Sequence, residues 1–80
     1  MEITYSRASV KAIGSMDKAT KQRIKAAIEK IPDGDIKPLK GCSGVYRLRV
    51  GSWRILFSFP KQDTILIEKI GPHGDVYKGV

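Results

Sequence analysis

Alternating apolar and polar residues dominate the middle of the chain. Over residues 45–50 and 53–59 an apolar side chain recurs at nearly every second position, which is typical of strands buried on one face. The two runs are separated by Gly51-Ser52, a dipeptide suited to a two-residue hairpin turn. We therefore predict a β-hairpin that turns at these two residues and places Arg49 opposite Arg54.

This register sorts the side chains of the hairpin onto two faces, because opposed residues share a face and successive residues alternate. The face expected to be buried carries Tyr46, Leu48, Val50, Trp53, Ile55 and Phe57. The other face, expected to be wet and basic, gathers Arg47, Arg49 and Arg54 around Leu56. Opposing Arg49 to Arg54 costs some fraction of about 1 kcal/mol, and a bound anion would remove that cost.

Two helices are predicted before the hairpin. Ser6 can cap a helix that runs from Arg7 to Gly14-Ser15, with Val10 and Ile13 as its buried positions. Asp17 caps the clearer second helix, which Pro32 ends. The apolar stripe of this second helix has spacings of three and four and consists of Thr20, Ile24, Ala27, Ile28 and Ile31.

Strands are expected at both ends of the chain. Residues 1–5 alternate weakly and indicate a short first strand, whereas residues 32–44 are interpreted as a loop in which Leu39 reaches the core. Residues 64–70 are apolar on both faces for much of their length, which predicts an interior strand that Gly71-Pro72-His73-Gly74 breaks. Residues 75–78 are expected to form a short last strand or an extended tail. This order predicts an α+β fold in one domain spanning residues 1–80. It has a short N-terminal strand, a helical hairpin on one face, and an antiparallel sheet of three to four strands.

The charge of the chain is strongly positive and unevenly distributed. Fifteen Lys and Arg against eight Asp and Glu give a net charge of +7, which favours an acidic partner such as nucleic acid, an anionic membrane surface or an acidic protein segment. Residues 36–59 hold no acid and five bases, Lys37, Lys40, Arg47, Arg49 and Arg54. Surfaces that serve only solubility usually mix both signs. We therefore interpret this basic face as a candidate binding site, with a merely solvated surface as the alternative.

Several classes of protein are excluded or disfavoured. The single cysteine, Cys42, excludes an intrachain disulfide, and one cysteine with one histidine cannot form a Cys/His zinc site. No apolar run approaches the length of a membrane span, and no signal peptide opens the chain. We expect a cytoplasmic protein without metal, cofactor or membrane partner.

Several motifs carry a resemblance to a known family. They are Leu39-Lys40-Gly41, Tyr46-Arg47-Leu48-Arg49-Val50-Gly51, Trp53-Arg54-Ile55-Leu56-Phe57 and the ending Ile70-Gly71-Pro72-His73-Gly74-Asp75-Val76-Tyr77-Lys78. Over nearly its whole length the chain resembles the RelE/ParE toxin superfamily of bacterial type II toxin–antitoxin systems. The resemblance implies a RelE-like two-layer sandwich. The superfamily holds ribosome-dependent messenger RNA endonucleases and DNA gyrase inhibitors on one fold, so the fold alone does not settle the function.

The resemblance also implies roles for individual residues. Arg47 and Arg49 match basic residues that contact RNA and assist proton transfer, and Arg54 matches the arginine that holds the scissile phosphate. Tyr77 matches a tyrosine of the site, and His73 stands where a basic residue, often arginine, is expected. Lys37 and Lys40 extend the set expected to bind RNA.

These matches favour a toxin that cleaves messenger RNA on the ribosome without a metal and so inhibits translation. His73 has an ordinary pKa of about 6.5, suited to either proton role near neutrality, and Tyr77 could stack on a base or donate a proton. The implied partners are messenger RNA on the ribosome and a cognate antitoxin with an acidic, partly disordered segment. The alternatives are a DNA gyrase inhibitor without catalytic activity and an inactive RNA-binding family member. A protein-binding inhibitor would not need these arginines to converge with His73 and Tyr77.

Overall fold

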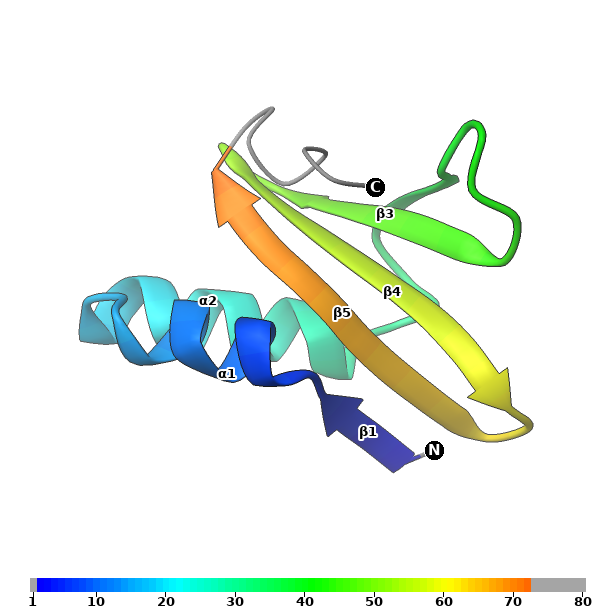
Figure 1. Ribbon diagram of the computed structural model, residues 1–80. Helices are drawn as coiled ribbons and strands as arrows, with labels where there is room; N and C mark the ends of the chain where they lie inside the picture. The colour runs from blue at the N-terminus through cyan, green and yellow to red at the C-terminus, as the bar shows by residue number, and fades with distance from the viewer. Residues whose placement is uncertain (1, 73–80) are drawn as a thin grey trace.

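The computed structural model describes residues 2–72, which form one mixed sheet and two helices (Figure 1). In chain order the elements are β1 (Glu2–Tyr5), α1 (Arg7–Gly14), α2 (Lys18–Glu29), β2 (Asp35–Pro38), β3 (Val45–Val50), β4 (Trp53–Lys61) and β5 (Thr64–Pro72). The strands lie in the order β1-β5-β4-β3-β2. All neighbours are antiparallel except β1 and β5, which are parallel. The predicted α+β order is confirmed. Within the described residues, no helix is long and apolar enough to cross a membrane.

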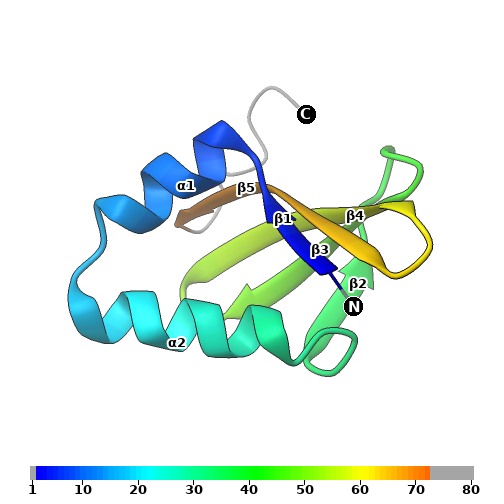
Figure 2. The ribbon, with the colours of Figure 1, turned by 90° about the horizontal axis from the view of Figure 1, so that it is seen from below.

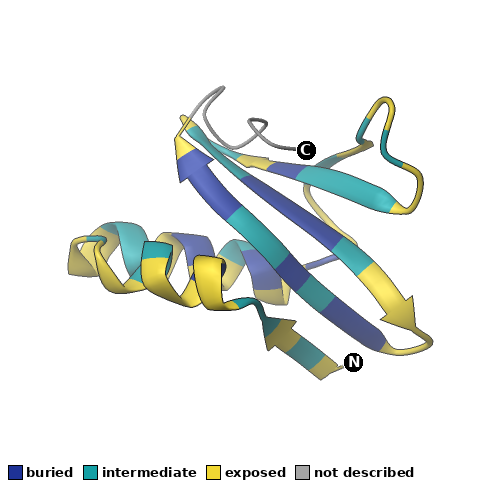
Figure 3. Cartoon of the chain, viewed as in Figure 1, coloured by how far each residue is buried: buried dark blue, intermediate teal, exposed yellow. Residues whose placement is uncertain are grey.

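The hydrophobic core lies between α2 and one face of the sheet (Figures 2 and 3). Asp17 caps α2 as predicted, since its carboxylate accepts hydrogen bonds from the hydroxyl and the backbone N–H of Thr20. These bonds, the hydroxyl bond first, lower the pKa of Asp17. The predicted stripe supplies Ile24, Ile28 and Ile31, which pack against Leu48, Ile55, Phe57, Ile65, Ile67 and Ile70 of the sheet.

A β-bulge in β5 explains why that strand looks apolar on both faces. Leu56 pairs with Lys69, but the next residue of β4, Phe57, pairs with Ile67, so Glu68 is an extra residue. An extra residue shifts the alternation by one position. Both Ile67 before the bulge and Ile70 after it therefore join the core.

The start of α1 is anchored at this bulge. Ser6 caps the helix by accepting a hydrogen bond from the Ser9 N–H, and its hydroxyl donates to the Glu68 carbonyl at 2.7 Å. The hydroxyl of Ser9 is fully buried and lies 3.1 Å from the Ile67 carbonyl oxygen. The prediction that Val10 is buried is wrong, because these contacts turn Ser9 inward and leave Val10 57% exposed. Ile13 packs against the core as expected.

The segment predicted as a loop, residues 32–44, contains a strand. β2 pairs antiparallel with β3, with Asp35 opposite Arg49 and Pro38 opposite Tyr46. This strand lacks the apolar alternation that would reveal it in the sequence, and Pro38 is tolerated because β2 is an outer strand of the sheet. Leu39 is half-buried and does not belong to the core cluster, because its N–H donates to the Val45 carbonyl and holds it beside β3.

The end of β5 also differs from the prediction. Gly71 and Pro72 continue the strand and pair with Arg54 and Trp53 of β4. The break is therefore wrongly predicted at Gly71-Pro72, because pairing with β4 continues the strand past the glycine. The rest of the predicted break and the last element expected at residues 75–78 lie outside the described residues.

Replacing Ser6 by alanine tests the anchoring of α1. Ser6→Ala removes the helix cap and the bond to Glu68 together, so we expect the free energy of unfolding in urea to fall by about 1–2 kcal/mol. Ser15→Ala is the control, since its hydroxyl bonds only within the exposed end of the helix, to the Ala12 carbonyl. Equal losses in the two variants would contradict the anchoring role.

Candidate functional site

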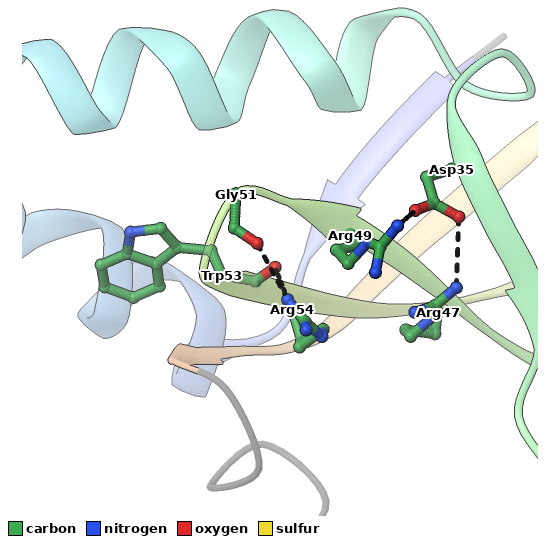
Figure 4. A network of polar contacts seen from close by, with 6 residues as sticks. All are labelled: Asp35, Arg47, Arg49, Gly51, Trp53 and Arg54. Atoms are coloured by element: carbon green, nitrogen blue, oxygen red, sulfur yellow. Dashed lines mark hydrogen bonds and ion pairs between the residues drawn. The ribbon is translucent and has the colours of Figure 1, made fainter.

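Three arginines share the sheet face that points away from the core. The hairpin register is the predicted one, with Val50 opposite Trp53 and Arg49 opposite Arg54 across the Gly51-Ser52 turn. Arg47 is opposed by Leu56, and the alternate residues Leu48 and Ile55 are buried in the core behind them. Figure 4 shows Arg47, Arg49 and Arg54 projecting from neighbouring positions of β3 and β4.

Arg54 folds back onto the hairpin turn. Its Nη1 donates to the carbonyls of Gly51 and Trp53, both at 3.1 Å. Arg23 of α2 approaches the same turn from the other side, because a Cβ built on Gly51 would lie 2.6 Å from Arg23 Nη2. Gly51 itself has a φ of 59°, a conformation that glycine adopts without steric cost. The turn therefore lies between two guanidinium groups, of which the sequence analysis identified only Arg54.

The Gly51→Ala variant tests this turn. An alanine there would meet both the positive φ and the Arg23 guanidinium, so the free energy of unfolding should fall by about 1 kcal/mol or more. Gly14→Ala is the control, because Gly14 ends a helix with no atom within 4 Å of its added Cβ. That variant should be unchanged or slightly more stable in the same urea titration. A Gly51→Ala protein as stable as the parent would contradict the described turn.

An acidic residue that the sequence analysis missed stands inside the basic face. Asp35 of β2 lies between Arg47 and Arg49 (Figure 4). Its Oδ1 is 3.3 Å from Arg47 Nη2, and its Oδ2 is 2.5 Å from Arg49 Nη2. Asp35 comes one residue before the acid-free stretch 36–59. No local sequence signal marks it, because only the pairing of β2 with β3 sets it opposite Arg49.

The centre of this face is covered, which corrects the prediction of a uniformly wet surface. Leu56 is 2% exposed although it lies on the face opposite the main core cluster. Its opposed neighbours are Arg47 on β3 and Lys69 on β5, two residues whose long aliphatic stems can cover apolar surface. The Arg47 side chain is 16% exposed and that of Arg49 is 52% exposed. Arg49 therefore presents the more open guanidinium of this pair.

The other predicted site residues are only partly placed. Lys37 is exposed on β2 and opposed to Arg47, so it extends the row of cations on this face. Lys40 is exposed in the turn after β2. His73 and Tyr77 lie outside the described residues.

A cavity of about 340 Å³ lies beside the face, between α2 and the strands β2 and β3. Its charged lining residues come from both layers and are Arg23, Lys30, Asp33, Asp35 and Arg49. Because Asp35 and Arg49 line it, the cavity connects the basic face with the cations of α2. Its mixed charge distinguishes it from a purely cationic anion pocket.

The chemical groups on the described part of the basic face are mainly guanidinium cations, which stabilise negative charge but do not act as a catalytic acid and base. Guanidinium groups stay protonated in proteins and donate paired hydrogen bonds to phosphate or carboxylate oxygens. The carboxylate of Asp35 is already held by two of them. Within residues 2–72, no group of three or more His, Cys, Asp or Glu side chains is placed to hold a metal ion.

Comparison with protein families identifies the chain. The model of the ParE toxin of type II toxin–antitoxin system, parDE, matches residues 3–77. The chain belongs to this toxin family. The toxin therefore falls within the RelE/ParE superfamily, as its motifs predicted. A comparison with curated proteins gave no match.

Solved structures support the same relationship. The RelB–RelE antitoxin–toxin complex from Methanococcus jannaschii contains a chain that is 27% identical to the toxin, with a TM-score of 0.75. That match covers 92% of the toxin and 94% of the other chain. The intact RelBE toxin–antitoxin complex of E. coli matches at 11% identity and a TM-score of 0.69, over 89% and 94% of the two chains. At that identity the second match supports the fold alone.

Proposed function

We propose that this toxin is an endoribonuclease that cleaves messenger RNA on the ribosome, without a metal ion, and so stops translation. The observation that carries the proposal is the convergence of Arg47, Arg49 and Arg54 on one face of the hairpin. Three guanidinium groups on adjacent positions suit a phosphodiester, whose oxygens accept paired hydrogen bonds. The similarity to the archaeal RelE chain over almost the whole toxin adds support.

The proposed reaction uses the RNA's own 2′-hydroxyl as the nucleophile. Its oxygen attacks the adjacent phosphorus, the bond from phosphorus to the 5′-oxygen breaks, and a 2′,3′-cyclic phosphate and a 5′-hydroxyl form. A base removes the proton of the 2′-hydroxyl, and an acid protonates the departing 5′-oxygen. Negative charge builds up on the phosphate oxygens, where Arg54 and the Arg47–Arg49 pair would stabilise it.

Charge stabilisation and proton transfer are assigned to different residues of the proposed site. Arg47 and Arg49 cannot act as bases because a guanidinium does not lose its proton near neutrality. The family resemblance gives Arg47 and Arg49 only an assisting part in proton transfer, so we assign the base and the acid to His73 and Tyr77. The ribosome would contribute by holding the RNA in line for attack, which a site as small as this one cannot do alone.

The gyrase-inhibitor function remains the second candidate, and one observation favours it. The family model that matches residues 3–77 is that of the ParE toxin. Under this alternative the arginines would bind a protein surface, and substituting them would leave RNA intact. Induction in cells separates the candidates, since an endonuclease stops translation at once whereas a gyrase inhibitor causes DNA damage signalling.

We also propose an antitoxin as the protein partner. Both similar structures are toxin–antitoxin complexes. The net charge of +7 favours an acidic segment that is disordered when free and folds on binding.

The variant Arg54→Ala tests the proposed site. Loss of one donor to the reacting phosphate should slow cleavage on programmed ribosomes, in single turnover, by about 100- to 1,000-fold. Stability should change little, because the loss of its two hydrogen bonds to the hairpin turn is offset by the removal of a charge opposed to Arg49. Lys18→Ala, an exposed position at the start of α2, serves as the control and should cut at the parental rate. Cleavage by Arg54→Ala at the parental rate would refute the site assignment and favour the gyrase candidate.

The variant His73→Ala tests the proton relay. If the imidazole carries a proton in the reaction, the parental rate should change with pH around the ordinary histidine value of about 6.5. The variant should be slower and should lose that titration. The readout is the single-turnover rate between pH 5.5 and 8.5, a range that brackets the histidine pKa by about one to two pH units. An unchanged pH profile in the variant would remove His73 from the mechanism.

A further inference from the structure

Asp35 occupies the position on the basic face that an anionic ligand would be expected to take. Its two carboxylate oxygens bridge Arg47 and Arg49, one oxygen to the Nη2 of each arginine. A carboxylate and a phosphodiester present the same kind of charged acceptor to a guanidinium. The arginine pair is thus already bound to an acceptor from the chain itself.

The exposure of these side chains indicates that a ligand can break the ion pairs between Asp35 and the two arginines. Asp35 is 35% exposed and the Arg49 side chain 52% exposed, and ion pairs in contact with solvent are weak because water competes for both partners. Each arginine contributes only its Nη2 to Asp35, although a guanidinium carries five N–H donors. A phosphate can therefore either approach the remaining donors, against the repulsion of the carboxylate, or displace it.

We propose that Asp35 is an internal counter-ion of the RNA site and lowers its affinity for phosphodiesters. This inference rests on the proposed function only in taking RNA as the ligand. In the free toxin Asp35 holds the two like-charged arginines together and neutralises one of their charges. RNA that offers nothing but its backbone then binds weakly. RNA held by further contacts, as on a ribosome, has the additional binding energy needed for its phosphate to displace the Asp35 carboxylate from the two arginines.

The chain provides a closely matched control for this proposal. Asp33 lies two residues away, is exposed and lines the same cavity as Asp35. Among the described residues, no ion pair joins it to Arg47 or Arg49. Asp33→Asn and Asp35→Asn therefore change the net charge equally, and only the second releases the arginine pair.

The experiment measures binding of a short 2′-O-methyl RNA oligonucleotide, which the proposed reaction cannot cleave, by fluorescence anisotropy across a salt series. At low salt Asp35→Asn should bind about three- to fivefold more tightly than the parent, the effect of one partly exposed charge contact. The slope of log affinity against log salt should steepen by about 0.7 for each phosphate newly engaged. Asp33→Asn should show less than half of this gain, and Asp35→Glu, which keeps the charge, should bind like the parent.

The possible results separate clearly. Equal gains in the two asparagine variants would overturn the proposal, because net charge alone would explain them. Weaker binding by a folded Asp35→Asn, checked by circular dichroism, would also overturn it, since Asp35 would then be needed to build the site. The same holds if neither the parent nor Asp35→Asn binds the oligonucleotide. Because the ligand cannot be cleaved, this test is independent of the Arg54→Ala cleavage assay, and each proposal can fail while the other stands.

Discussion

The packing of α2 against alternate residues of β3, β4 and β5 is the constraint on which the rest of the structure depends. Each isoleucine, leucine or phenylalanine buried there contributes about 1.5–3 kcal/mol. A one-residue slip in the pairing of a hairpin strand would move the buried side chains of that strand to the opposite face. The repulsion between Arg49 and Arg54 costs less than about 1 kcal/mol, which is smaller than the contribution of one buried side chain. The apolar face therefore determines the register, and this register places the arginines on the opposite face. The basic face of the toxin is a consequence of how its core is packed.

Where local chemistry determines the structure, the sequence was sufficient to predict it. The hairpin register follows from strict alternation around Gly51-Ser52, and both helix caps follow from Ser6 and Asp17 standing directly before helix-forming residues. Each of these features depends on residues that are close in the chain. The family resemblance then extended the interpretation from fold to function.

The errors concern residues whose structure depends on distant partners. Val10 is exposed because Ser9 bonds to the bulge in β5, more than fifty residues away in the chain. β2 forms because β3 offers it a partner, and no pattern within residues 35–38 indicates a strand. The same pairing brings Asp35 to the arginines, so counting charges along the chain could not reveal the acid inside the basic face. The alternation of the hairpin was thus enough to place Arg47, Arg49 and Arg54 on one face, whereas the ion pairs that Asp35 forms with two of them were missed.

The outer strands of the sheet have a consequence for self-association. β1 and β2 are each four residues long, and they form the two ends of the strand order. Pro38, at the end of β2, has no N–H to offer to a neighbouring chain. Lys37 beside it carries a charge that would face its own copy if two such strands met. Short outer strands with proline and lysine oppose the joining of sheets from separate molecules. This sheet is therefore poorly suited to seeding fibrils, even though its interior strand β5 is nine residues long and holds three isoleucines.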